Sequence, residues 1–252
     1  MKIQYCSDLH IEFKLNWEYL SQFRLQPEGE ILLLAGDIVP FSVMNRYNDF
    51  FNYLSDNFEQ VCWIPGNHEY YHFDLADKQD PLCEKIRSNI TLLNNTTFTY
   101  KQVNFLCTTM WSKIKPQHEV EVQLGVSDFF LIKNNEARLT AQKFNEMHQA
   151  GLAYLEQALH THAGETNFIM THHVPTMLRY PVYFRHSPIN DAFAVELHDF
   201  IEQTNARYWL YGHHHCPVKD FTIGNTVMIT NQLGYVKENQ HKHFRTGAVV
   251  EC

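Results

Sequence analysis

Polar side chains follow several short apolar runs in this chain, at the point where each run ends. The run Val61–Ile64 stops at a Pro-Gly turn, and an amide, an imidazole and a carboxylate follow at Asn67, His68 and Glu69. Such a run is typical of a buried strand, and the carboxyl ends of strands in open α/β sheets form a crevice. The same pattern recurs with Asp8 and His10 after Lys2–Cys6, Asp37 after Ile31–Ala35, His172 and His173 after Asn167–Met170, and His213 and His215 after Tyr208–Tyr211. We therefore expect these side chains to meet in one crevice.

Two of these groups have the spacing of metal ligands. Asp8 and His10 are separated by one residue, as are His213 and His215. In an extended segment residues i and i+2 share a face, so each pair is expected to converge on one ion. Carboxylate oxygen, amide oxygen and imidazole nitrogen suit Mn, Fe, Zn or Ni, and the absence of thiolate argues against a structural Cys-type zinc site. The pattern therefore indicates a transition-metal site.

The order of these motifs resembles that of the calcineurin-like metallophosphoesterase superfamily. The family pattern is Asp-x-His, Gly-Asp, Gly-Asn-His followed by Glu or Asp, a His after a strand, and Gly-His-x-His, and every part occurs here in that order. Each part alone is common in unrelated proteins, whereas the ordered set is specific. The stretches 109–111, 128–132 and 231–235 are similar to a bacterial branch of the family, so the resemblance extends over nearly the whole chain.

The resemblance implies two divalent metal ions, of Mn, Fe, Zn or Ni. It assigns Asp8, His10 and His215 to the first ion, Asn67, His172 and His213 to the second, and Asp37 to both. In two-metal hydrolases the ions lie about 3.5 to 4 Å apart and clamp the oxygens of an in-line displacement at phosphorus. The resemblance therefore implies direct attack by a hydroxide that bridges the metals, without a covalent phospho-enzyme.

Catalytic roles are implied for Asp37, as the bridging ligand, and for His68. By resemblance, His68 stabilises the transition state or protonates the leaving oxygen, a role worth typically about 10² to 10⁴-fold in rate. Glu69 is expected to orient the loop rather than perform chemistry. Of the two neighbouring histidines, the family's Thr-His element favours His172 as the ligand, which leaves His173 beside the centre or on the substrate side.

The predicted substrate is a small phosphoester. The predicted contacts, Arg46, Tyr70, His173, Arg179 and Arg185, would supply aromatic faces and positive charge, and a nucleotide stacked on an aromatic rim is one form such a substrate could take. The main prediction is a dinuclear metal-dependent phosphohydrolase that cleaves P–O bonds of phosphodiesters or phosphomonoesters. The alternatives are a phosphoprotein phosphatase and a non-catalytic metal-binding scaffold of the same fold.

Composition limits the expected partners. A formal net charge of -8 argues against a general nucleic-acid surface, which would need a face rich in Lys and Arg. Two divalent ions, two carboxylates and a hydroxide would leave a local charge of about +1, enough to attract a phosphate anion. The 6 cysteines lack a Cys-x-x-Cys spacing, which favours reduced thiols and a cytoplasmic location. No apolar run approaches the roughly 20 residues of a transmembrane helix, so no membrane partner is expected, and the oligomeric state stays open.

Alternating strand and helix patterns predict an α/β fold in one domain over residues 1–252. The βα units followed by hairpins suggest two mixed β-sheets packed together and flanked by helices, the four-layer α/β/β/α sandwich that the resemblance also implies. Helices are expected over 16–25, 46–58 and 73–88, from Thr140 up to Gly164, and after Asp191 as a capping residue. The stretch 112–135 has no clear period and is predicted to be a loop excursion or partial cap near the site.

Overall fold

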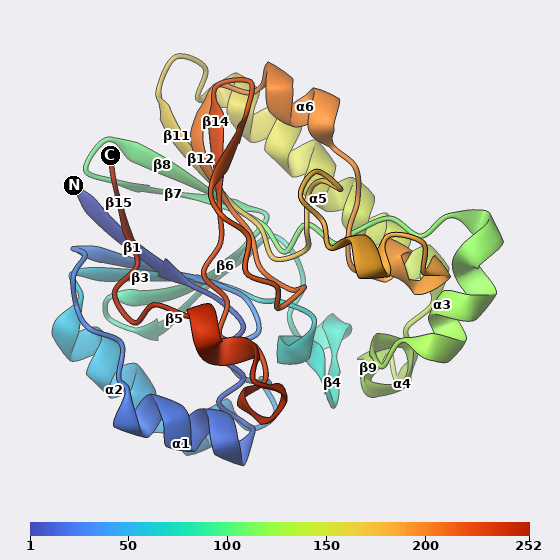
Figure 1. Cartoon of the computed structure of the whole chain (residues 1–252), viewed down its shortest axis with the longest axis horizontal. Helices are drawn as coiled ribbons and strands as arrows, with labels where there is room; N and C mark the ends of the chain where they lie inside the picture. The colour runs from blue at the N-terminus through green and yellow to red at the C-terminus, as the bar shows by residue number, and fades with distance from the viewer.

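Two six-stranded β-sheets pack face to face in the computed structural model, which covers residues 1–252 (Figure 1). The first sheet consists of β1 (Lys2–Cys6), β2 (Ile31–Ala35), β3 (Gln60–Ile64), β5 (Leu82–Arg87), β6 (Ile90–Asn94) and β15 (Val249–Glu251). Its order is β15-β1-β2-β3-β6-β5. The inner strands are parallel, and β15 and β5 pair antiparallel at the edges.

The second sheet has the same plan of parallel inner strands and antiparallel edges. It consists of β7 (Thr96–Tyr100), β8 (Val103–Cys107), β11 (Thr166–Met170), β12 (Ala206–Leu210), β13 (Phe221–Ile223) and β14 (Thr226–Ile229). Its order is β13-β14-β12-β11-β8-β7. The hairpins β13–β14 and β7–β8 supply the antiparallel edges.

Helices cover the outer face of each sheet. On the first sheet lie α1 (Lys14–Gln22) and α2 (Asn48–Asn57), and on the second lie α5 (Ala141–Thr161) and α6 (His198–Gln203) (Figure 1). The predicted fold class is therefore confirmed. None of the helices combines the length and the apolar composition needed to span a membrane.

Strand β2 shows why the inner strands read as continuous apolar runs. Leu32 and Leu34 point outward and pack in the same cluster as Leu54 of α2. Leu33, one position along, points into the space between the sheets, where it shares a cluster with Phe168 of β11. Because side chains alternate across a strand and both faces are covered, every position of β2 is apolar.

The long helix expected after Thr140 is confirmed as α5. The Thr140 hydroxyl accepts a hydrogen bond from the backbone N–H of Lys143 at 3.2 Å, which satisfies one of the free donors at the start of the helix. Phe144 and Leu155 are buried on its inner side and join different apolar clusters. This helix therefore links the second sheet to the neighbouring stretch 112–135.

The predicted helix over 73–88 is wrong. This stretch contains β4 (Phe73–Asp74), a short 3-10 helix and β5, which pairs antiparallel with β6. Pro81 lies inside the stretch, and a proline in a helix interior removes a hydrogen bond and clashes with the preceding turn. The edge strand begins at Leu82, directly after this proline.

The stretch 112–135 has more regular structure than predicted. It contains α3 (Glu119–Gly125), α4 (Asp128–Leu131) and β9 (Ile132–Asn134). Strand β9 joins β4 and β10 (Ala137–Arg138) in a small third sheet. Val122 and Phe129 are buried, because the helices turn their apolar side chains toward the core around α5.

The predicted start of the helix after Asp191 is also wrong. Residues Pro188–Ala192 form a 3-10 helix, and α6 begins only at His198. The Asp191 carboxylate accepts a hydrogen bond from the backbone N–H of Lys115 at 2.9 Å and lies 2.8 Å from Nδ1 of His118. Asp191 therefore anchors the stretch 112–135 instead of capping a helix. The other 3-10 helices are Met44–Tyr47, His68–Tyr70, Leu75–Asp77, Pro116–His118, Val182–Phe184, Val236–Glu238 and Gln240–His243.

Candidate metal centre

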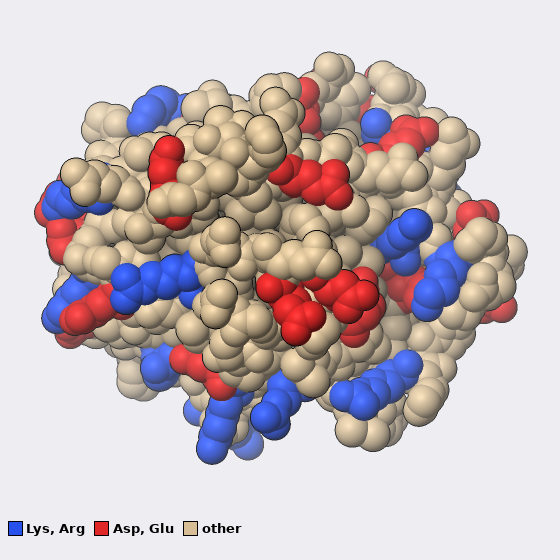
Figure 2. All heavy atoms as spheres, turned by 90° about the horizontal axis from the view of Figure 1, so that it is seen from above, with Lys and Arg blue, Asp and Glu red and all other residues tan.

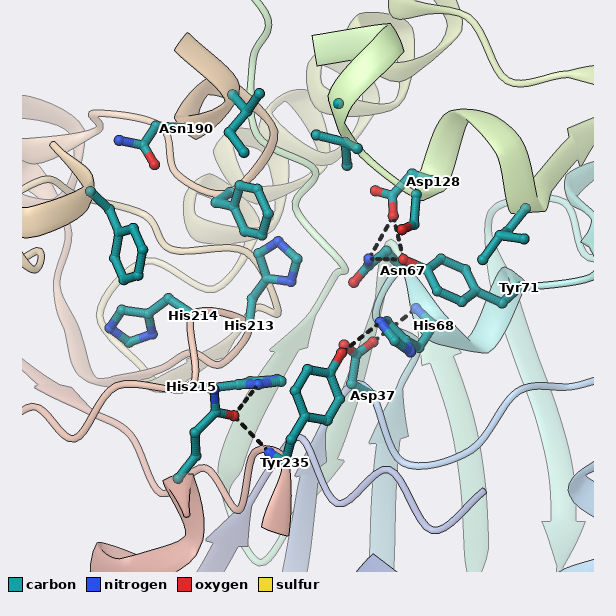
Figure 3. A pocket seen from close by; sticks show the side chains of 18 of the residues that line it. Asp37, Asn67, His68, Tyr71, Asp128, Asn190, His213, His214, His215 and Tyr235 are labelled. Carbon is teal, nitrogen blue, oxygen red and sulfur yellow. Dashed lines mark hydrogen bonds between the residues drawn. The ribbon is translucent and has the colours of Figure 1, made fainter. Parts of the chain in front are cut away.

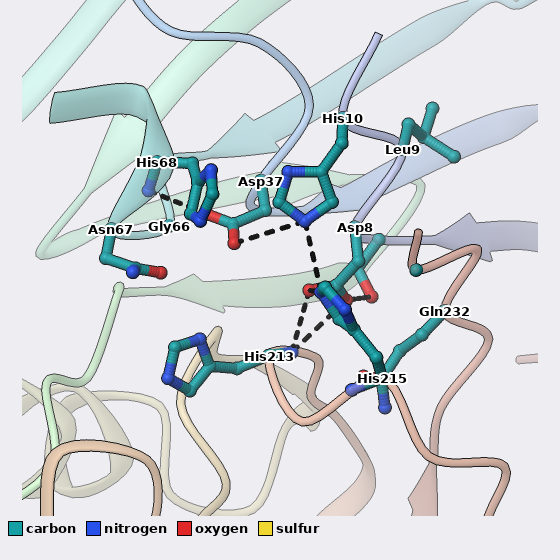
Figure 4. Close-up of polar contacts among 12 residues, drawn as sticks. Asp8, Leu9, His10, Asp37, Gly66, Asn67, His68, His213, His215 and Gln232 are labelled. Carbon is teal, nitrogen blue, oxygen red and sulfur yellow. Dashed lines mark hydrogen bonds and ion pairs between the residues drawn. The ribbon is translucent and has the colours of Figure 1, made fainter. Parts of the chain in front are cut away.

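The polar strand ends of both sheets meet in one buried cluster (Figure 4). Much of it is held in the left-handed backbone region, with φ of 55° at Asp8, 44° at His10, 56° at Asp37, 78° at His213 and 48° at His215. This region is uncommon for residues other than glycine, and each instance costs about 1 to 3 kcal/mol. Turns of this kind, and not the extended segments predicted from the spacing, bring the side chains together.

One group of ligand atoms comes from Asp8, His10, Asp37 and His215, which all lie within 4.8 Å of one another. Nε2 of His10 lies 3.0 Å from Nε2 of His215 and 3.6 Å from Oδ2 of Asp37. Oδ1 of Asp8 lies 3.2 Å from Nε2 of His215. These residues are the set predicted for the first ion, together with the predicted bridging carboxylate.

A second group forms around the other oxygen of Asp37. Oδ1 of Asp37 lies 3.4 Å from Nε2 of His172, which lies 3.1 Å from Nδ1 of His213. Oδ1 of Asn67 lies 3.3 Å from the same His172 nitrogen. Asp37 therefore faces one group with each carboxylate oxygen, and His213 and His215 belong to different groups rather than to one shared ion.

The protonation of the imidazoles shows that these groups fit a cation. Nδ1 of His10 lies 3.3 Å from a Glu12 carboxylate oxygen, and Nδ1 of His215 lies 2.8 Å from Oε1 of Gln240. With these Nδ1–H groups donating to oxygen, the two Nε2 atoms face each other at 3.0 Å with lone pairs. Two facing lone pairs repel, and a divalent ion between them removes the repulsion. In the same way, Nδ1 of His172 donates to the carbonyl oxygen of Ala35 at 2.8 Å, which directs Nε2 toward Asp37 and the centre.

The charges of the centre require a positive partner. Asp8 and Asp37 are buried, and a buried carboxylate is costly unless it is paired or coordinates a metal. Burial lowers the pKa of His172, but the negative charge of Asp37 outweighs it and raises that pKa to about 9. Burial lowers the pKa of His213 well below its ordinary value, so this ring is neutral at pH 7. The cluster thus favours a cation: the neutral ring of His213 is suited to bind one, and a metal ion would take the place of the proton that Asp37 stabilises on His172.

Two glycines allow the close approach of these loops. A Cβ atom on Gly66 would lie 2.2 Å from Oδ1 of Asp37 and 2.6 Å from Nε2 of His172. A Cβ atom on Gly36, which has φ of 86°, would lie 2.4 Å from Nδ1 of the same histidine. Any larger residue at either position would push apart the two halves of the centre.

Glu69 connects the loop that follows β2 with the loop that follows β3. Its buried carboxylate accepts hydrogen bonds from the backbone N–H groups of Asp37 at 2.8 Å, Ile38 at 2.7 Å and Gly66 at 2.7 Å, and from the Trp63 indole at 3.2 Å. Burial and the nearby Asp37 charge raise its pKa to about 7, against the effect of the backbone donors. This placement agrees with an orienting role and keeps Glu69 away from the cavity.

His68 lies beside the centre and lines the cavity (Figure 3). Its backbone N–H donates to Oδ1 of Asp37 at 2.9 Å, and its ring stacks on Tyr71 with centroids 4.0 Å apart. Nδ1 lies 3.5 Å from a Glu12 oxygen, and Nε2 lies 3.3 Å from the Tyr235 hydroxyl. Burial lowers the pKa of His68, but Asp37 and Glu12 outweigh it, so the pKa lies above its ordinary value.

Asp128 connects the stretch 112–135 to the centre. Its Oδ1 accepts hydrogen bonds of 2.8 Å from Nδ2 of Asn67 and of 2.8 Å from the Tyr71 hydroxyl. The bond to Asn67 fixes the orientation of the amide, so that Oδ1 of Asn67 faces His172. The other carboxylate oxygen of Asp128, Oδ2, is buried without a hydrogen-bond partner. Asp128 therefore positions a predicted ligand from outside the motifs.

A cavity of about 680 Å³ opens beside the two groups (Figure 3). Asp37, Asn67, His68, His213 and His215 lie on its polar side. Its other side is largely apolar and is formed by the stretch 112–135 and by the loop between β11 and α6. The cavity is thus large enough for an organic group in addition to a phosphoryl group.

The predicted substrate contacts do not line this cavity. Tyr70 is buried in the core with its ring edge against Phe41, and Arg46, Arg179 and Arg185 lie at the exposed surface. His173 accepts a hydrogen bond from the backbone N–H of Ser112 at 2.9 Å and stacks on His213 at 4.3 Å. His172 therefore faces the centre, as the predicted register requires, and His173 supports a predicted ligand from behind. The role of these residues in substrate binding stays a prediction.

Several residues of the site were missed from the sequence. Glu12 could have been identified from the sequence, because Asp8, His10 and Glu12 occupy alternate positions. Tyr235 ends the stretch 231–235 that resembles a branch of the family, but that resemblance assigned it no role. Gln240 lies in the loop that follows, where the sequence offers no local signal.

Comparisons with known proteins agree with the motifs. The calcineurin-like phosphoesterase family matches residues 1–217. Uncharacterized protein L509 of Acanthamoeba polyphaga mimivirus is 28% identical over 267 residues, which cover 95% of this chain and 93% of that protein. Phosphopantetheinyl hydrolase from Mycobacterium tuberculosis has a similar structure, with a TM-score of 0.72 at 18% identity, over 99% of this chain and 95% of that chain.

A dimetal phosphatase from Danio rerio is also similar in structure, with a TM-score of 0.53 at 14% identity, over 92% of this chain and 87% of that chain. At such identities the structural likeness shows the fold alone. The family match covers most of the chain and includes every motif residue gathered at the strand ends. It shows that the chain belongs to the calcineurin-like phosphoesterase family.

Proposed function

We propose that this protein is a two-metal phosphohydrolase that cleaves P–O bonds of small organic phosphodiesters or phosphomonoesters. One observation carries the proposal: two buried groups of ligand atoms share Asp37, one oxygen facing each group. Asp8, His10 and His215 would hold one ion with Asp37, and Asn67, His172 and His213 would hold the other. When bound, such ions supply Lewis acidity that neutralises phosphoryl charge and activates water.

The chain's own residues would orient the substrate and move the proton. His68 is placed beside Asp37 at the cavity, and Glu12 and Tyr235 hold its two ring nitrogens. We propose that His68 donates a hydrogen bond or a proton to the leaving oxygen. The apolar wall would exclude water around the organic group, which strengthens the electrostatic interactions at the reacting phosphorus.

The proposal includes a small substrate and no nucleic-acid partner. On the face shown in Figure 2, Lys and Arg side chains lie among Asp and Glu side chains, without a continuous basic stripe. Mixed charge of this kind supports the absence of a general nucleic-acid surface. We also propose a cytoplasmic location, supported by cysteines that are all unpaired, Cys6, Cys62 and Cys107 among them as buried thiols.

Hydrolysis by metal-loaded protein tests the function. Metal-free protein is reloaded with Mn, Fe, Zn or Ni and assayed on p-nitrophenyl phosphate and on bis(p-nitrophenyl) phosphate. We expect turnover of at least one ester with at least one metal, and its loss in Asp37→Ala. No turnover with any metal would contradict the enzyme and favour a scaffold. The phosphopantetheinyl hydrolase with the similar fold makes a phosphopantetheinyl ester a reasonable further substrate in the assay.

A further inference from the structure

The cavity beside the metal centre has two chemically different sides. The ligand side is polar, and the opposite wall is built from Val126, Leu131, Ile189 and Phe193, with Tyr180 and Phe184 nearby. These side chains come from α4, the loop before it, and the loop between β11 and α6. An apolar wall of this kind gains free energy by covering apolar surface of a ligand.

No basic side chain lines the cavity, although a phosphoester is anionic. Its charged residues other than histidine are the carboxylates Glu12, Asp37 and Asp128, and it contains no Lys or Arg. Metal ions at the centre would neutralise one phosphoryl group, but a second anionic group would find no cation and would approach Glu12 or Asp128. Two negative charges in the same cavity repel each other, and the repulsion is strongest where water is excluded.

Four residues that line the cavity each have a buried polar atom without a hydrogen-bond partner: Glu12, Asp128, Asn190 and His213. His213 is a predicted metal ligand, and Glu12 faces His10 and His68 with its other oxygen, so Asn190 and Asp128 are the two considered for the organic group. Nδ2 of Asn190 is unpartnered, while its Oδ1 accepts a hydrogen bond of 3.2 Å from the Tyr180 hydroxyl. Oδ2 of Asp128 is also unpartnered. Asn190 is 8% exposed and Asp128 is 1% exposed, and both are seen around the cavity in Figure 3. Buried groups of this kind are costly, so a ligand that pairs with them gains affinity.

We infer that the substrate carries one phosphoryl group joined to an uncharged, partly apolar organic group with a hydrogen-bond acceptor for Asn190 and a donor for Asp128. A secondary amide on a short alkyl chain has this chemistry. The inference rests on the proposed function and narrows its substrate class. It disfavours compounds with several phosphates and phosphopeptides with acidic neighbours.

The test compares matched esters on metal-loaded protein. Butyl phosphate is the reference. Butane-1,4-diyl bisphosphate carries a second phosphate at the other end of the same chain, and 2-(acetylamino)ethyl phosphate carries an uncharged amide. Each is offered as the free ester and as its p-nitrophenyl diester, which covers both reaction types. We expect kcat/KM to fall at least about tenfold with the second phosphate and to rise about tenfold with the amide. Equal values across the series would overturn the inference.

Variants separate the inference from the proposed function. Asn190→Leu is expected to bring the ratio of kcat/KM for the amide ester over the butyl ester close to one, and Ile189→Lys is expected to raise the relative rate for the bisphosphate. Val120→Ser, at an exposed position of α3, is the control and should keep both ratios. Hydrolysis of p-nitrophenyl esters reports whether the centre of each variant is intact. If the metal-loaded wild type hydrolyses none of the esters, the proposed function is wrong. If it hydrolyses them but the cavity variants leave the kcat/KM ratios between esters unchanged, only this inference is wrong.

Discussion

Individual side chains in this protein are oriented by partners that the motifs do not include. Glu12, Gln240 and the carbonyl oxygen of Ala35 each accept from the Nδ1–H of a predicted ligand histidine. Each bond fixes the tautomer and aims Nε2 into the centre. Glu12 also approaches His68, so one carboxylate orients a predicted ligand and the predicted catalytic histidine together.

Replacing His68 separates catalysis from metal binding. The ring of His68 packs against that of His10 with centroids 4.4 Å apart, but its nitrogens face Glu12 and the Tyr235 hydroxyl, and the resemblance does not count it among the ligands. We therefore expect His68→Ala to keep its metals and to lose about 10² to 10⁴-fold in kcat. Metal content by mass spectrometry and steady-state kinetics measure the two effects. His160→Ala, exposed on α5, is the matched control. An unchanged kcat would remove His68 from the chemistry.

Replacing Glu69 tests its structural role. Glu69→Gln substitutes an amide N–H₂ for an oxygen that accepts from backbone donors, which leaves at least one buried N–H unpaired. We expect the free energy of unfolding to fall by about 2 to 4 kcal/mol, measured by denaturant titration of the metal-free protein. Glu156→Gln on α5, which the structure leaves without a hydrogen bond or ion pair, should change it by less than about 0.5 kcal/mol. Equal stability of the two variants would rule out the proposed role of Glu69.

At the scale of elements, the stretch 112–135 serves the site as well as the core. Its helices bury Val122 and Phe129 against the core, and the first residue of α4, Asp128, lies against Asn67. The turn between α3 and α4 supplies Val126 to the wall of the cavity. Packing of these helices and positioning of a predicted ligand are therefore coupled.

Removing the Asp128 carboxylate tests this coupling. In Asp128→Ala the amide of Asn67 loses the acceptor that orients it, so we expect the affinity for the second metal ion to fall about 10- to 100-fold. Competition with a fluorescent chelator measures the affinity. Glu121→Gln, exposed on α3 of the same stretch, controls for loss of a negative charge. If both variants bind metal as the wild type does, Asp128 does not position Asn67.

The elements also show what the sequence could reveal. Strand ends were predictable because an apolar run and the polar residues after it are local signals, as at Val61–Ile64 and Asn67. The stretch 128–132 was singled out by resemblance, but the role of Asp128 was not predictable, because its contact with Asn67 depends on the packing of helices from a distant part of the chain. The helix predicted over 73–88 failed although Pro81 argued against it, since the apolar residues there were read with the wrong period.

At the scale of the whole molecule, the two sheets build one centre from both halves of the chain. The first sheet supplies Asp8, His10, Asp37 and Asn67, and the second supplies His172, His213 and His215. Cations at this junction would bind both sheets and neutralise buried carboxylates. Metal binding is therefore expected to stabilise the packing of the sheets.

Metal removal should destabilise the entire fold. An ion that binds only the folded protein and is present at 100 times its Kd adds about 2.7 kcal/mol to the free energy of unfolding. We expect chelation to lower the Tm measured by calorimetry and readdition of manganese to restore it. Asp37→Ala should show a much smaller shift, and a Tm of the wild type that is independent of metal would contradict a structural contribution.

Diffraction from crystals grown with manganese, recorded at the metal absorption edge, tests the central claim most directly. We predict two anomalous peaks about 3.5 to 4 Å apart, with one oxygen of Asp37 directed at each or shared between them. The expected ligands are Asp8, His10 and His215 at one peak and Asn67, His172 and His213 at the other. A single peak, or two peaks that Asp37 does not join, would contradict the two-metal centre.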